Sequence, residues 1–161
     1  MLGRMPHQDW LAAPNAQDQA VVETALRATQ AWAWRERSLG QLSGGERQRV
    51  LLARAMAVQA QVMLMDEPLA NLDPPHQVDW LEQVHCLTAQ HTTVISVLHE
   101  VSMALHADDM VVMQSGRVMH QGACADAATH RAVETVFDNR IAIHSLDGQW
   151  VTLPKLARDS S

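Results

Sequence analysis

The sequence has 161 residues, 47% of them apolar, and its 18 acidic and 12 basic residues give a formal net charge of −6 at pH 7. This length fits one domain, or part of one, with a moderate core. The acidic balance argues against a nucleic-acid partner, because neutralising phosphates requires clustered lysine and arginine. No apolar run reaches the roughly 20 residues that cross a bilayer, and no signal peptide is expected. We therefore expect a cytosolic protein in which Cys86 and Cys124 are reduced thiols.

The first half of the chain predicts a loop, two helices and two strands. Residues 1–15 contain two prolines and a glycine and predict a loop. Apolar residues at helical spacing predict an amphipathic helix over 16–29 and a second, largely buried helix over 45–58. The runs 62–65 and 93–98 are short and mostly apolar, which favours strands covered on both faces.

Between these two strands, a segment beginning at Pro74 and Pro75 predicts a helix, so the three elements form a parallel βαβ unit. The helical spacing in that segment is carried by Val78, Leu81, Val84 and Leu87. A short helix is expected near 101–106. Turn residues at 114–116 and at 147–148 predict two hairpins. The polar tail, 157–161, is expected to fray.

The run Leu42–Gln48 has the design of a phosphate-binding site at the start of a helix. Glycines at 44 and 45 let backbone N–H groups approach an anion, and the positive end of the helix dipole lies at the same place. Ser43 can cap the helix and donate its hydroxyl. Taken alone, Ser-Gly-Gly is more often an ordinary helix cap.

Asp66 and Glu67 follow the first predicted strand directly, at the carboxyl end where ligands of open α/β sheets gather. An Asp there can hold Mg²⁺ through its water shell, and the next Glu can orient or deprotonate the water that attacks a γ-phosphate. The alternative is a solvated acidic loop, which is the commoner meaning of an isolated Asp-Glu pair.

His99 closes the second predicted strand, so in a parallel sheet it emerges at the same edge as Glu67. A histidine at that edge could contact the γ-phosphate. The alternative is a packed or surface histidine, which is the commoner role of one among nine.

The order of these motifs, LSGGERQRV, VMLMDEP and VLHE, closely resembles the ATP-binding-cassette (ABC) family over nearly the whole chain. The resemblance implies an α/β fold, namely the C-terminal part of a P-loop NTPase of ABC type. In that fold, a helical signature subdomain precedes a partial parallel sheet with flanking helices and C-terminal hairpins. Residues 1–58 would form the helical subdomain. Residues 59–161 would run from the Walker B strand to the end of the RecA-like core.

The same resemblance implies the roles of individual residues and the cofactors ATP and Mg²⁺. The signature residues Ser43, Gly44, Gly45, Glu46 and Gln48 would bind ATP in trans, Asp66 would bind Mg²⁺ through water, Glu67 and His99 would be catalytic, and Asn71, Leu72 and Asp73 would form the D-loop. In this family two cassettes sandwich two ATPs. A second ABC ATPase subunit is therefore the implied partner, with transmembrane permease subunits and, indirectly, an extracytoplasmic substrate-binding protein. The implied location is the inner face of the cell membrane.

A finer resemblance is to importers of iron siderophores, haem or cobalamin, carried by residues 1–10, 73–77 and 136–140. Two alternatives stay open. One is a soluble ABC ATPase without a membrane partner, and the other is a degenerate, non-catalytic fragment that only binds a partner.

No G-x-x-x-x-G-K-[ST] run occurs in the sequence. Such a loop cradles the β- and γ-phosphates, so this chain alone is not expected to bind or hydrolyse ATP normally. The resemblance implies that a family domain has its first third ahead of Met1, including the strand that carries the phosphate loop. Without that strand, we expect an exposed apolar sheet edge.

Overall fold

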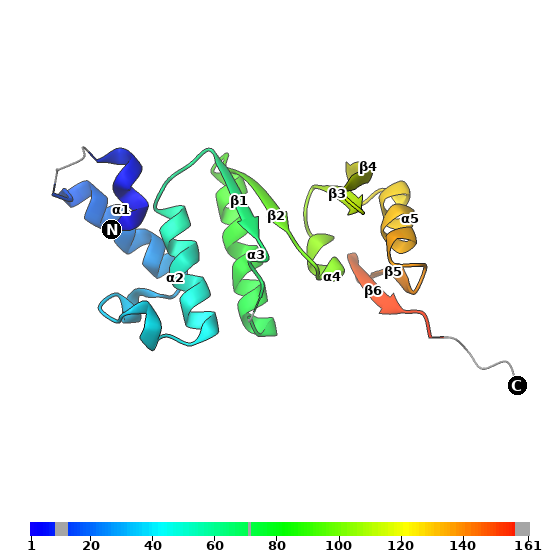
Figure 1. The fold of residues 1–161 in the computed structure, drawn as a ribbon, viewed down its shortest axis with the longest axis horizontal. Helices are drawn as coiled ribbons and strands as arrows, with labels where there is room; N and C mark the ends of the chain where they lie inside the picture. Colours follow the sequence, from blue (N-terminus) through cyan, green and yellow to red (C-terminus); the bar gives the residue numbers. More distant parts are fainter. Residues whose placement is uncertain (9–12, 71, 157–161) are drawn as a thin grey trace, which may run out of the picture. The chain divides into compact units, whose positions relative to one another are not determined.

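The computed structural model describes residues 1–8, 13–70 and 72–156, and it divides into two compact units, Met1–Val97 and Leu98–Ser161 (Figure 1). The first unit contains η1 (Leu2–His7), α1 (Ala16–Ala28), η2 (Trp32–Trp34), η3 (Leu39–Gln41), α2 (Gly44–Met56), β1 (Val62–Asp66), α3 (Pro74–Ala89) and β2 (Thr93–Val97). The second contains α4 (Val101–Ala104), β3 (Asp109–Gln114), β4 (Arg117–Ala123), α5 (Ala127–Val136), β5 (Ile141–Leu146) and β6 (Gln149–Pro154). Both units contain helices and strands, which confirms the predicted α/β class. The expected subdivision near residue 58 falls inside the first unit and stays a prediction.

The helices α1 and α2 pack together through small residues and confirm the two predicted helices. Ala25, Ala53 and Ala57 are buried at their contact, and larger apolar side chains surround them. Alanine lets two helix backbones approach closely, and it is also the best helix former. In the described part of the chain, no helix has the length and hydropathy that crossing a membrane requires.

The predicted loop over 1–15 is wrong for its first part, because Leu2–His7 forms the 3₁₀ helix η1. The buried side chain of Arg4 fixes this helix. Its Nε donates to Asp18 Oδ1 at 2.9 Å, and its Nη1 donates to the Ala57 carbonyl at 3.1 Å and to Gln59 Oε1 at 2.7 Å. Glycine and proline in this segment pointed to a loop, whereas a buried arginine cannot be recognised from local sequence. Residues 9–12 lie outside the described residues.

Gly3 lies against α2, and no side chain fits between them. A Cβ atom at this position would lie 2.4 Å from the Arg54 carbonyl oxygen and 3.0 Å from Ala57 Cβ. We expect Gly3→Ala to lower the free energy of unfolding by about 1–3 kcal/mol, which is the usual cost of overpacking. Urea titration followed by circular dichroism measures this change. The matched control is Gly40→Ala, because a Cβ there meets no atom within 4 Å. An equal loss for both variants would contradict the close approach.

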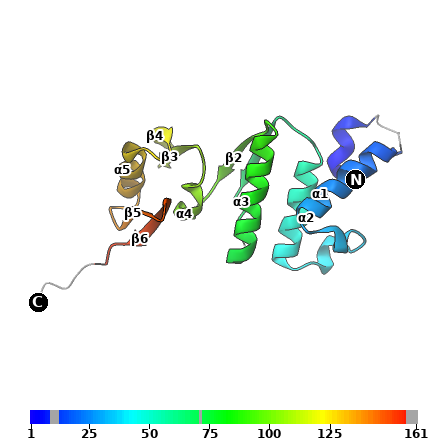
Figure 2. The same ribbon diagram turned by 180° about the vertical axis from the view of Figure 1, so that it is seen from behind.

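The strands β1 and β2 pair in parallel, with Leu64 opposite Ile95, and they confirm the predicted βαβ unit with α3 as its helix. The helix α3 covers one face of this sheet (Figures 1 and 2). On that face Met63 is buried. The expectation that both faces are covered is wrong for the described chain. On the opposite face Val62, Leu64, Ile95 and Val97 are 53%, 75%, 53% and 53% exposed.

The second unit contains two hairpins, the short helix α4 and the helix α5, which packs on β3, β4 and β5. Both predicted hairpins are confirmed. Their turn residues, Ser115-Gly116 and Asp147-Gly148, all have positive φ, as type I′ turns require. Helix α5 was not predicted. The predicted helix near 101–106 is present as Val101–Ala104, and the expected fraying over 157–161 lies outside the described residues.

The two cysteines differ in their surroundings. Cys86 is exposed on α3, and Cys124 is buried at the end of the β3–β4 hairpin; both are free thiols. Burial, with Asp109 and Asp108 nearby, raises the pKa of the Cys124 thiol. This thiol is therefore protonated at neutral pH and packs as a small apolar group.

Candidate functional site

The start of α2 is capped by two of the predicted signature residues, Ser43 and Glu46. Ser43 Oγ accepts a hydrogen bond from the Glu46 N–H at 3.3 Å, and Glu46 Oε2 accepts one from the Ser43 N–H at 2.7 Å. Ser43 and Gly44 are exposed. The N–H groups of Gly44 and Gly45, in the first turn, lie where a helix offers them no carbonyl partner of its own, and the helix dipole is positive here. The geometry therefore suits an anion brought from outside.

The carboxylate of Glu46 stays ionised in this position. The hydrogen bond from the Ser43 backbone lowers the pKa of Glu46, and the Ser43 side chain and the charges of Arg37 and Arg49 lower it further. Partial burial acts in the opposite direction. A fixed negative charge therefore lies beside the anion-facing N–H groups, which favours a ligand that brings its own cation.

We expect acid to lower the free energy of unfolding by protonating carboxylates such as Glu46. Folding lowers the pKa of Glu46, whose ordinary value is 4.5, and that of Asp18, whose hydrogen bond from Arg4 is the main cause. Each group thus stabilises the fold above its ordinary pKa and loses that contribution as pH falls through its folded pKa. Urea titrations at successive pH values should show stability that is level from pH 7 to about 5 and declines below about 4.5.

The control for this pH dependence is Glu46→Gln, which keeps the capping hydrogen bonds and cannot titrate. Its stability should decline less steeply in acid than that of the unmodified protein. A decline that begins above about pH 5.5 would point to histidines and contradict the assignment to carboxylates.

Asp66 and Glu67 lie at the carboxyl end of β1, where the sequence predicts them. Both side chains are exposed. Glu67 has φ 47°, and its N–H donates to the Val97 carbonyl at 3.0 Å. A non-glycine residue in this left-handed region stores backbone strain of a kind that clusters at functional sites.

The described residues contain no group of three or more His, Cys, Asp or Glu side chains that could hold a metal ion. The side-chain carboxylates of Asp66 and Glu67 are nevertheless suitable ligands for Mg²⁺, because this ion is often bound through one or two carboxylates, several waters and phosphate oxygens. These residues alone would not hold it.

The predicted D-loop residues lead into α3. Asp73 caps this helix, since its Oδ1 accepts from the His76 N–H at 3.3 Å. Leu72 is half-buried, and Asn71 lies outside the described residues. His99 is exposed and belongs to the second unit, two residues beyond the end of β2. Its expected meeting with Glu67 stays a prediction, as do the roles of the other site residues.

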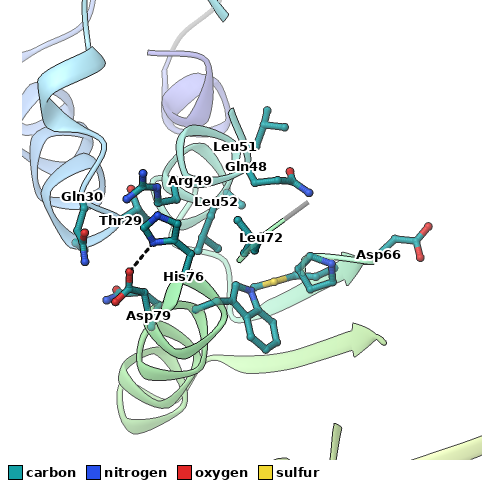
Figure 3. Close-up of a pocket in the computed structure, with 16 residues that line it drawn as sticks. Thr29, Gln30, Gln48, Arg49, Leu51, Leu52, Asp66, Leu72, His76 and Asp79 are labelled. Atoms are coloured by element: carbon teal, nitrogen blue, oxygen red, sulfur yellow. Dashed lines mark hydrogen bonds and ion pairs between the residues drawn. The ribbon is translucent and has the colours of Figure 1, made fainter. Parts of the chain in front are cut away.

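A pocket of about 170 Å³ lies between α2, α3 and the end of β1 and brings together Gln48, Asp66 and Leu72 (Figure 3). Its remaining lining is Ala28, Thr29, Gln30, Arg49, Leu51, Leu52, Ala55, Met65, Pro68, His76, Asp79, Trp80 and Gln83. His76 Nδ1 and Asp79 Oδ2 lie 3.0 Å apart. The Asp66 carboxylate points away from this pair in Figure 3. The pocket therefore joins three predicted site residues from separate motifs.

Two buried donors in the walls of this pocket were missed by sequence reasoning. The Nε of Arg49 and the Nε1 of Trp80 have no hydrogen-bond partner among the described residues. The Arg49 guanidinium lies over the Trp34 ring, with its Cζ 4.6 Å from the ring centroid. An oxygen acceptor, from water or from another molecule, would satisfy either donor. The helical spacing of Trp80, Val84 and Leu87 was the available signal for the buried tryptophan.

Comparison with known proteins gives a consistent result. The family model described as ABC transporter matches residues 4–70. The achromobactin transport ATP-binding protein of Dickeya dadantii is 42% identical over 139 residues, which are 85% of this chain and 52% of that protein. The hemin import ATP-binding protein of Rhodococcus jostii is 35% identical over 96% of this chain and 53% of its own length. The cobalamin import ATP-binding protein of Halobacterium salinarum is 40% identical over 88% of this chain and 36% of its own length.

Among solved structures, an inward-facing metal-chelate type ABC transporter matches with a TM-score of 0.82 and 25% identity, over 97% of this chain and 64% of that one. A dimeric bacterial ABC transporter cassette matches with a TM-score of 0.63 over 73% of this chain and 52% of that one. The chain thus spans about half the length of most of the curated relatives it matches.

Proposed function

Given that this chain belongs to the ABC transporter family of ATPases, we propose that it is part of the ATP-hydrolysing subunit of an importer for iron siderophores, haem or cobalamin. The cargo class is supported by the names of its relatives, which transport achromobactin, hemin and cobalamin. The observation that carries the proposal is the exposed, Ser43-capped start of α2, which presents free first-turn N–H groups to an anion.

In this proposal the chain acts on ATP held mainly by another cassette subunit. Ser43 donates its hydroxyl, and Gly44 and Gly45 donate backbone N–H groups, to phosphates that the other subunit presents. Glu46 and Gln48 flank that contact. The bond that is broken is the one between the β- and γ-phosphates of the bound ATP. This trans contact needs no phosphate loop in the present chain.

The other half of the site would serve ATP bound to the same polypeptide. Asp66 orients water around Mg²⁺, Glu67 orients the attacking water, and His99 contacts the γ-phosphate. Asp73, at the start of α3, couples the two sites across the subunit interface, with Asn71 and Leu72 beside it. Since the 161 residues contain no phosphate-loop sequence, we propose that this second half is inactive in the isolated chain.

The proposed partners are a second ABC ATPase subunit, permease subunits at the inner face of the membrane and, through them, an extracytoplasmic substrate-binding protein. A second candidate function is a non-catalytic module that joins a partner without hydrolysing ATP. The missing phosphate-loop sequence favours that candidate for the isolated chain.

Two measurements test the proposal. Calorimetry of the isolated chain with ATP and Mg²⁺ should show no binding in the micromolar range. Mixing the chain with the full-length hemin import relative should change the rate at which that relative hydrolyses ATP. Micromolar binding by the chain alone would contradict the division into two halves. An unchanged rate at saturating chain concentration would contradict the trans contact.

A further inference from the structure

The pocket between α2 and α3 has a mostly apolar surface and two unsatisfied donors in its walls. Figure 3 shows that α2 contributes Leu51 and Leu52 to the lining and that α3 contributes His76. All of the lining residues lie between positions 28 and 83, so the pocket is formed within the first unit. We call it the α2–α3 pocket.

Both donors belong to side chains that the fold packs around this pocket. Trp80 is 6% exposed, and its Nε1 has no hydrogen-bond partner among the described residues. The same is true of the Nε of Arg49, whose guanidinium is held over the Trp34 ring. A buried N–H group without an acceptor is costly, so two of them around one pocket indicate an acceptor that comes from outside.

The size of the α2–α3 pocket limits the molecule that brings this acceptor. Its volume is about 170 Å³, whereas pockets for drug-sized ligands measure roughly 300–1,000 Å³. An apolar cavity of about 150 Å³ is enough to hold benzene. The pocket therefore suits a molecule with a single ring and excludes a whole nucleotide.

The charged groups of the lining favour a negative acceptor. The Asp79 carboxylate is engaged with His76, since Oδ2 and Nδ1 lie 3.0 Å apart, and the Asp66 carboxylate points away from this pair in Figure 3. Arg49 brings a permanent positive charge. A carboxylate has only acceptors, so it matches two donors, and its hydrogen bonds with arginine are charge-assisted.

We propose that the α2–α3 pocket binds a small aromatic carboxylate. The ring lies among the apolar side chains of the lining, and the carboxylate oxygens accept hydrogen bonds from Arg49 and Trp80. This binding site is separate from the start of α2 at Ser43, and it does not depend on the proposed function.

The two donor nitrogens are covered by neighbouring atoms. A ligand oxygen therefore reaches them only when part of the lining turns aside. Gln48, Met65 and Gln83 have long, unbranched side chains that can change rotamer at this pocket. Binding should consequently alter the surroundings of the Trp80 indole.

The test is a titration of the full, ¹⁵N-labelled chain with benzoate, followed by nuclear magnetic resonance. The chain contains five tryptophans, and the indole N–H signal of Trp80 is the one that is lost in Trp80→Phe. Millimolar benzoate should shift this signal downfield, because its N–H gains an acceptor. Acetate has no ring and toluene has no acceptor, so each should bind at least about tenfold more weakly than benzoate.

Two variants remove the donors one at a time. Trp80→Phe and Arg49→Met should each weaken benzoate binding about tenfold or more, measured on the signals of other lining residues. The matched controls are Trp32→Phe and Arg54→Met, because neither residue lines the pocket. Both controls should bind benzoate as the unmodified chain does. Circular dichroism melts show which variants are folded, and Arg49→Met decides the matter if Trp80→Phe unfolds.

Three results would overturn the proposal. The first is an unchanged Trp80 signal at the highest soluble benzoate concentration. The second is equal weakening in the pocket variants and their controls. The third is toluene binding as tight as that of benzoate, which would show a purely apolar pocket and contradict the role of the two donors.

Discussion

Replacing Ser43 with aspartate is expected to abolish the effect of this chain on the ATP turnover of a full-length relative. Aspartate caps a helix as well as serine does, so α2 should remain folded. Its carboxylate, however, would face the phosphates of the ATP at the same helix start. A lost hydrogen bond to a charged group weakens the contact by about tenfold to a hundredfold, and the like charges add to that loss.

The matched control is Ser38→Asp, which adds the same charge at the start of the exposed helix η3. Glu67→Gln should also have little effect, because in the proposed function Glu67 serves ATP bound to its own polypeptide. Turnover is measured at several chain concentrations, so that weaker association is separated from slower hydrolysis. Equal losses from the Ser43 and Glu67 variants would count against the trans contact.

Replacing Arg4 with methionine is expected to lower the melting temperature by about 5–15 °C, which is the range expected when one partner of a buried ion pair is removed. Arg4 and Asp18 are 5% and 3% exposed in their side chains. Methionine fills part of the space, but among the described residues it leaves the buried carboxylate with hydrogen bonds from Gln8 and the Asn15 N–H alone. It also removes the donors to the Ala57 carbonyl and Gln59.

Differential scanning calorimetry compares this variant with Arg27→Met, which removes an exposed ion pair to Glu23 and should shift the melting temperature by at most about 2 °C. Adding Asp18→Asn to Arg4→Met should recover part of the loss, since no buried charge would remain. Similar shifts for the Arg4 and Arg27 variants would show that the buried pair does not hold η1 in place.

The parts of the fold that the sequence predicted well are those with a local cause. The hairpin turns at Ser115-Gly116 and Asp147-Gly148 follow from residues that tolerate positive φ. The start of α2 follows from a serine three residues before a glutamate. The resemblance to ABC ATPases, which rested on the order of such motifs, is confirmed by the family match.

The parts that were missed depend on contacts between distant residues. The local sequence around Arg4 is typical of a surface charge in a loop, whereas its contacts with residues 14 to 55 positions away bury its side chain and hold η1 in place. The unbroken apolar run of β1 favoured two covered faces, but periodicity does not say what lies opposite each face. For the site, the sequence predicted which residues end each strand, whereas the pocket that joins Gln48, Asp66 and Leu72 depends on how α2, α3 and the end of β1 lie around it.

The hydrogen bond from the Glu67 N–H to the Val97 carbonyl closes the ladder between β1 and β2. The Glu67 amide proton exchanges with solvent only when this last hydrogen bond of the ladder breaks. Hydrogen exchange at Glu67 therefore measures how often this residue leaves its strained, left-handed backbone conformation. Because the end rungs of a sheet open more readily than the central ones, we expect the Glu67 amide to exchange faster than the amides within β1.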